Sequence, residues 1–128
     1  MALSHRVSTS VRSNAGTVTS TSYTITGTAE QNIEKTFAIG TDVAQDFACD
    51  VSTIVSLAIM STTAMTIETN SSSAADDTIT LVANKPLIWN TQILATLGTA
   101  CPLTTDVTSL FITNAAAADL TMYVLTNE

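Results

Sequence analysis

The stretch that most constrains the fold is residues 54–90, in which short apolar runs alternate with turns of small polar residues. Residues 54–60 are apolar apart from Ser56, a pattern typical of a strand that is covered on both faces. Residues 65–69 and 78–83 alternate apolar and polar side chains, which is the period of a half-buried strand. The stretch therefore predicts several short strands of a sheet core and suggests no reactive site.

The rest of the chain has the same character. Thr occurs 25 times and Ser 13 times, and β-branched Thr suits a pleated surface better than a helix. Residues 17–26 alternate like a half-buried strand, and residues 1–13 are predicted to be a polar strand or an extended N-terminal arm. Helical periodicity is sustained nowhere, so no full helix is expected. Residues 50–57 can hold a single helical turn, and residues 92–102 are left without an element.

An internal repeat indicates how the strands are arranged. Residues 50–70 and 106–127 each begin with Asp-Val and two hydroxyl residues, continue through a strand, a turn and a returning strand, and end in Thr-Asn. The pattern predicts two similar hairpins on facing sheets, as in a sandwich or jelly roll. We therefore expect an all-β fold in a single domain over residues 1–128, an antiparallel, jelly-roll-like β-sandwich of about eight to ten short strands. An up-and-down barrel is the alternative.

Charge is divided unevenly along the chain. Residues 1–29 contain Arg6 and Arg12 and no acid, whereas residues 30–128 contain all 11 acidic residues and two lysines. The two parts thus carry +2 and −9, which sum to the net charge of −7. A chain this acidic is poorly suited to displacing phosphate counterions, so nucleic-acid binding is not expected. The asymmetry suggests an interaction surface in the acid-free segment. The expected partner-contact residues are Arg6, Val7, Val11 and Arg12.

Enzymatic chemistry is not expected. The single histidine, His5, lies in the polar N-terminal segment, where we expect a solvated side chain and not a rigidly held base. Glycoside hydrolysis needs two carboxylates beside an aromatic-lined groove, but Trp89 lies in an apolar strand and is expected in the core. The four glycines are spread singly and do not form a phosphate-binding loop.

No metal or other cofactor is expected either. Cys49 and Cys101 are far apart in sequence and are interpreted as small buried side chains, with a disulfide as the alternative. Three aspartates spaced four residues apart can share a strand face, but the layout of a calcium-binding loop is absent from the sequence. These are Asp42, Asp46 and Asp50; the pair Asp76 and Asp77 is interpreted as part of a solvated loop. The N-terminus lacks an apolar signal region, and no apolar run approaches the roughly 20 residues of a membrane span.

A second group of segments carries a family resemblance over most of the C-terminal part of the chain. The segments are SLAIM (56–60), MTIETN (65–70), DTITL (77–81), ANKP (83–86), WN (89–90), CPLT (101–104), DVT (106–108) and FITN (111–114). Their pattern resembles that of small virion proteins encoded by tailed bacteriophages, of the capsid cement or decoration type. The matching positions are structural, so the resemblance assigns no functional residue.

The resemblance implies a jelly-roll-like structural protein bound to the outside of a capsid, which it stabilises. The implied partners are the major capsid protein and other copies of the chain, as a homotrimer, without nucleic acid or membrane. The implied location is the capsid surface of the virion, after synthesis in the cytoplasm of the bacterial host. Two alternatives stay open: a tail, neck or head-fibre component of the virion, and a carbohydrate-binding or adhesive β-sandwich module that uses exposed aromatic residues.

Overall fold

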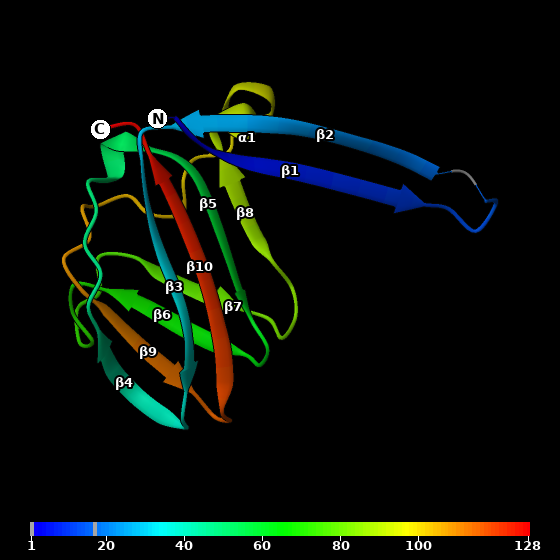
Figure 1. Cartoon of the computed structure of the whole chain (residues 1–128). Coiled ribbons are helices and arrows are strands. Elements are labelled where there is room, and N and C mark those ends of the chain that lie inside the picture. Colours follow the sequence, from blue (N-terminus) through cyan, green and yellow to red (C-terminus); the bar gives the residue numbers. More distant parts are fainter. Residues whose placement is uncertain (1, 17) are drawn as a thin grey trace.

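The computed structural model describes residues 2–16 and 18–128, which form a β-sandwich body and a long projecting hairpin (Figure 1). The hairpin consists of β1 (Leu3–Arg12) and β2 (Val18–Gly27). The body strands are β3 (Ala29–Phe37), β4 (Gly40–Gln45), β5 (Ile54–Ser61), β6 (Met65–Thr69), β7 (Thr78–Leu81), β8 (Leu87–Asn90), β9 (Leu110–Asn114) and β10 (Ala118–Thr126). Two short helical elements complete the chain, a 3₁₀ turn (Val51–Thr53) and α1 (Thr91–Leu97).

The body strands form two four-stranded antiparallel sheets, with the orders β3-β10-β5-β8 and β4-β9-β6-β7. The chain crosses from one sheet to the other at every connection between body strands except that from β6 to β7. This order is that of a jelly roll, so the predicted fold class is confirmed. An up-and-down barrel is excluded, because its consecutive strands would pair with each other.

The two copies of the sequence repeat are arches and not the hairpins that we predicted. In each copy the chain leaves one sheet and returns in the other, from β5 to β6 and from β9 to β10. The copies instead pair with each other, β5 with β10 and β6 with β9. The end of each copy also bonds to the start of the other. The Asn70 amide donates to the Ser109 carbonyl (2.9 Å), and the Asn127 amide donates to the Thr53 carbonyl (2.8 Å). A strand–turn–strand pattern does not encode whether its strands pair or face each other, which explains the error.

The core lies between the two sheets and is filled by aliphatic side chains. β5, β6, β9 and β10 alternate buried and less buried positions, as strands with one covered face do. Trp89 is buried as predicted, and its indole Nε1 donates to the Thr99 carbonyl (2.8 Å). The fully buried side chains are those of Leu57, Ile59, Ile67, Leu81, Leu103, Val107, Leu110, Ile112, Leu120, Met122, Val124 and Leu125.

Helix α1 was not predicted. Its seven residues are too few for a periodicity test, but its ends carry recognisable signals. The Asn90 side chain caps the first turn by accepting a hydrogen bond from the Ile93 amide (3.0 Å), and Gly98 ends the helix at a φ of +69°. Within the described residues, no helix has the length and apolar character needed to cross a membrane.

We call the β1–β2 hairpin the arm. Its base lies against the body, and its outer part extends beyond the β8 edge (Figure 1). All described residues from 8 to 22 are exposed. Residues 14–16 form a turn after β1, in which the Gly16 amide donates to the Ser13 carbonyl (3.0 Å). Residue 1 of the predicted arm and residue 17, the predicted start of the second strand, lie outside the described residues.

Candidate functional site

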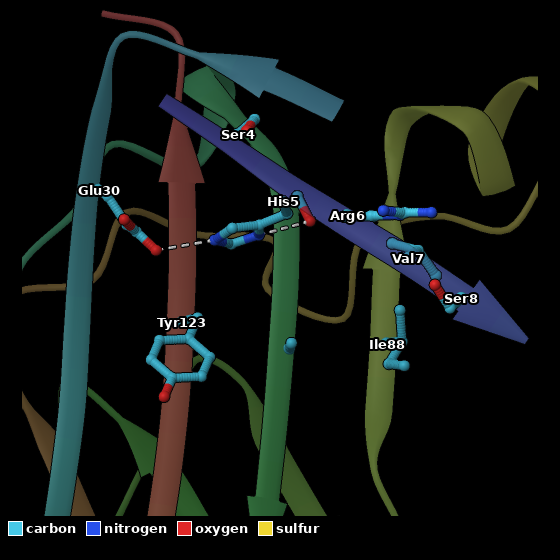
Figure 2. A pocket seen from close by; sticks show the side chains of 10 residues that line it. Ser4, His5, Arg6, Val7, Ser8, Glu30, Ile88 and Tyr123 are labelled. Carbon is cyan, nitrogen blue, oxygen red and sulfur yellow. Dashed lines mark hydrogen bonds and ion pairs between the residues drawn. The ribbon is translucent and has the colours of Figure 1, made fainter. Parts of the chain in front are cut away.

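The base of the arm and the sheet beneath it form the main concave site of the described structure. β1 crosses the outer face of the β3-β10-β5-β8 sheet (Figure 2). A cavity of about 520 Å³ lies between them, lined by β1 residues and by side chains of all four strands of the sheet. The sheet side chains in this cavity are those of Glu30, Ser56, Ala58, Ile88 and Tyr123. The site is therefore the contact between the base of the arm and the body, which we call the joint.

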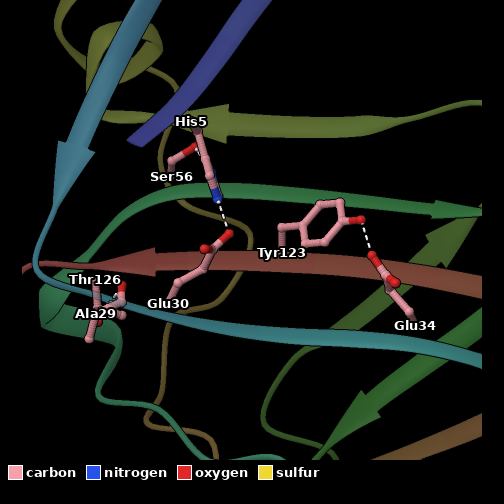
Figure 3. A network of polar contacts seen from close by, with 7 residues as sticks. All are labelled: His5, Ala29, Glu30, Glu34, Ser56, Tyr123 and Thr126. Atoms are coloured by element: carbon pink, nitrogen blue, oxygen red, sulfur yellow. Dashed lines mark hydrogen bonds and ion pairs between the residues drawn. The ribbon is translucent and has the colours of Figure 1, made fainter. Parts of the chain in front are cut away.

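His5 fixes this joint and is not the solvated side chain that we predicted. Its Nδ1 lies 2.9 Å from the Ser56 hydroxyl on β5, and its Nε2 lies 3.0 Å from the Glu30 carboxylate (Figure 3). Only 14% of the imidazole side chain is exposed. The prediction relied on the position of His5 near the N-terminus and neglected the alternation of the strand. By that alternation His5 lies on the same strand face as Val7, which is half-buried.

The Ser56–His5–Glu30 arrangement has the residue types of a hydrolase triad, but its geometry suits anchoring. If the Nε2–H of His5 donates a hydrogen bond to the Glu30 carboxylate, the Nδ1 of His5 accepts a hydrogen bond from the Ser56 hydroxyl. All three groups then have a hydrogen-bonding partner. Ser56 is 2% exposed and lies within β5, which pairs with a strand on each side and is crossed by β1. A nucleophile must be reached by its substrate, and a serine buried to this extent is poorly placed for this although its side chain borders the cavity.

Tyr123 and Glu34 continue the polar contacts of the same sheet face (Figure 3). The Tyr123 hydroxyl donates to the Glu34 carboxylate, and this hydrogen bond, more than burial, raises the pKa of Tyr123 above its ordinary value. The His5 and Tyr123 rings meet edge to face with their centroids 6.4 Å apart. Beside these groups lie Ala58 and Ile88, so the face combines an acidic side with an apolar side.

The arm itself has two different faces. Its register is continuous from the Leu3–Gly27 pair to the Arg12–Val18 pair, so alternate residues of β1 share a face with their partners on β2. The docking face carries Leu3, His5, Val7, Thr9, Val11, Thr19, Thr21, Tyr23 and Ile25. The opposite face carries Ser4, Arg6, Ser8, Ser10, Arg12, Val18, Ser20, Ser22, Thr24 and Thr26. The docking face is the one turned toward the body, because at the base its residues are half-buried and their neighbours are exposed.

The four predicted partner-contact residues separate into these two faces. Val7 and Val11 share the docking face, where Val7 lines the cavity and Val11 is 68% exposed. Arg6 and Arg12 lie on the opposite face, and the Arg6 guanidinium donates to the Ser22 hydroxyl (3.3 Å). The arrangement thus places Val11 and Arg12 on the exposed outer half of the arm, away from the cavity.

Other polar candidates serve the body. Asp77 is buried and not in the solvated loop that we predicted: its carboxylate accepts hydrogen bonds from the Thr104 amide (2.8 Å), the Thr104 hydroxyl (2.6 Å) and the Thr105 amide (3.2 Å). Burial opposes its charge, but these hydrogen bonds outweigh burial and hold the pKa of Asp77 below its ordinary value. The polar residues around Asp77 indicated an exposed loop, and they gave no sign that a second loop, at Thr104 and Thr105, would cover it.

The cysteines and the remaining aspartates form no reactive centre in the described residues. Cys49 and Cys101 are both free thiols, Cys49 buried and Cys101 partly buried, and burial raises the pKa of Cys49 to about 11. Within residues 2–16 and 18–128, no three side chains of His, Cys, Asp or Glu lie close enough together to hold a metal ion. Asp42, Asp46 and Asp50, which can share a strand face, are thus not gathered into such a group.

Comparison with known proteins adds no further identification. The chain matches no protein-family model, no curated protein and no solved structure.

Proposed function

We propose that this protein is a structural component of a bacteriophage virion, and that within the virion it is a cement protein on the outside of the capsid. In this role it stabilises the shell through contact area and performs no catalysis. Its partners are the major capsid protein and further copies of itself, and the arm provides the contact.

The exposed arm is the observation that carries this proposal. An isolated two-stranded hairpin is at best marginally stable in water. The outer half of the arm is such a hairpin, because all its described residues from 8 to 22 are exposed and its strands pair only with each other. A long hairpin that needs a covering surface suits a protein whose work is to bind neighbouring subunits.

The body supports the same role. Its jelly-roll core is complete without the arm, so the arm is free to engage a partner while the body holds its shape. The residue pattern that resembles small phage virion proteins lies in this body, between residues 56 and 114. The polar groups closest to a catalytic arrangement, Ser56, His5 and Glu30, are used to hold the base of the arm.

Quantitative mass spectrometry of purified phage particles tests the proposal. We expect this chain in hundreds of copies per particle, in a fixed ratio to the major capsid protein, as an outer-surface cement protein requires. A handful of copies per particle would replace the cement role with one in the tail, neck or a fibre. Absence from purified particles would refute the virion role as a whole.

A further inference from the structure

The docking face of the arm is longer than the part of it that the body covers. At the base, Leu3, His5 and Val7 are half-buried against the sheet, and Tyr23 and Ile25 are half-buried opposite them on β2. The same face continues along the outer half, where its members are β-branched but exposed. These members are Thr9, Val11, Thr19 and Thr21. A face that is half-buried at its base and continues outward as exposed, β-branched, uncharged side chains is suited to a second, similar surface.

The body offers such a surface next to the base of the arm: Ala58, Ile88 and Tyr123 border the cavity beneath β1, and the surface continues beyond them to Glu34, Met60 and Thr121. We call it the outer sheet face, made of Glu34, Ala58, Met60, Ile88, Thr121 and Tyr123, which neighbour one another through the pairing of β3, β10, β5 and β8. Met60 and Ile88 are 39% and 41% exposed although both are large and apolar. Glu34 and the nearby Asp119 give the β3 side of this face a negative charge.

We propose that the outer half of the arm binds the outer sheet face of a second copy of this chain. Within one chain, the base of the arm already makes a contact of this kind: β1 lies across the sheet with Val7 beside Ile88 (Figure 2). The proposed contact between two copies has the same form. The acid-free segment 1–29 carries +2 and residues 30–128 carry −9, so the arm of one copy is opposite in charge to the body of another. Arg6 and Arg12 lie on the face of the arm opposite the docking face, so this attraction acts at a distance and adds no ion pair to the contact.

The reach of the arm agrees with this partner. Ten-residue strands span about 33 Å, and residues 8–12 beyond the base account for roughly half of that length. Since neighbouring strands lie about 4.8 Å apart, roughly 15 Å of arm crosses three strands of a sheet. The contact joins different surfaces of the two copies, so it is heterologous and produces a closed ring or an open chain. It deepens the proposed function and rests on the part of it that makes the arm a contact between copies. It holds or fails in the absence of any capsid, so its failure is distinguishable from failure of the virion role.

Sedimentation velocity of the purified full-length chain, in low salt and over a range of concentrations, tests the proposal. We expect a species larger than the 13.4 kDa monomer. Val11→Asp, on the docking face of the arm, and Met60→Asp, on the outer sheet face, should each yield monomers. Ser10→Asp adds the same charge on the opposite face of the arm, and Val82→Asp adds it at an exposed apolar residue outside the outer sheet face; both should still associate.

Mixing the two monomeric variants identifies the type of contact. The Met60→Asp chain keeps an intact arm and the Val11→Asp chain keeps an intact sheet face, so the mixture should form a one-to-one dimer. Far-ultraviolet circular dichroism and Trp89 fluorescence verify that each variant is folded. A monomeric wild-type chain at all concentrations would overturn the proposal, as would unchanged association of Val11→Asp. Failure of the mixture to associate would also overturn it and would indicate arm-to-arm or face-to-face contact.

Discussion

Replacing His5 with Ala tests whether the base of the arm is anchored as the structure indicates. The substitution removes two hydrogen bonds, one to Ser56 (2.9 Å) and one to Glu30 (3.0 Å). A hydrogen bond contributes about 0.5–1.5 kcal/mol net, and a buried group left without a partner costs about 1–3 kcal/mol. Ser56 is 2% exposed and loses its partner, whereas Glu30 can turn to water. We therefore expect His5→Ala to lower the free energy of unfolding by about 2–4 kcal/mol.

Urea unfolding followed by the fluorescence of Trp89 measures this loss, since Trp89 is the single tryptophan and is buried in the body. Ser56→Ala and the double variant complete a mutant cycle, in which we expect a coupling of about 0.5–1.5 kcal/mol. Amide hydrogen exchange should show faster exchange in β1 than in β10 of His5→Ala. A loss below about 0.5 kcal/mol, or strictly additive single variants, would refute the anchoring role of His5.

Three further predictions concern the body and the point where the arm joins it. Asp77→Asn should lower stability at neutral pH by about 1.5–3 kcal/mol because three hydrogen bonds to a carboxylate are weakened. The depressed pKa of Asp77 stabilises the fold above the ordinary value of 3.8, and this stabilisation is lost as pH falls through the folded-state pKa, so urea midpoints of Asp77→Asn should depend less on acid pH than those of the parent. Because the pKa of Cys49 is raised on folding, the free energy of unfolding should fall by up to about 3 kcal/mol as pH rises from 9.0 toward about 11. Thermal melts of Cys49→Ala should show a smaller fall over this range. An equal fall would contradict the raised pKa of Cys49. Gly27→Ala places a Cβ 2.6 Å from the Thr126 carbonyl oxygen and should cost about 1–3 kcal/mol in urea, whereas exposed Thr26→Ala should cost less than about 0.5 kcal/mol.

Several strands of the body could be predicted because their side chains alternate over enough residues to show the period. Residues 65–69 and 78–83 were predicted as strands; β6 covers the first range and β7 covers the first four residues of the second, both with alternating burial. The repeat indicated a paired-sheet fold correctly, but it could not distinguish an arch from a hairpin. That choice depends on contacts between the two copies, such as the bond from Asn70 to Ser109, which are far apart in sequence.

The candidate site was largely beyond sequence reasoning. The acid-free segment was predicted to be an interaction surface, and this stays a prediction; within the segment, Val7 and Val11 share one face. The role of His5 depends on Ser56 and Glu30, which lie 51 and 25 residues away along the chain and meet it only when β1 crosses the sheet. One signal was available: Ser56 interrupts an otherwise apolar strand, and a polar residue in such a position needs a hydrogen-bonding partner.

Electron microscopy of phage particles that contain this chain tests the proposed cement role. We expect the jelly-roll body on the outer surface of the capsid, with residues 8–12 and 18–22 of the arm covered by protein. A map in which this chain lies elsewhere in the particle would contradict the cement role. A map in which the arm extends freely into solvent would contradict its role as the contact element.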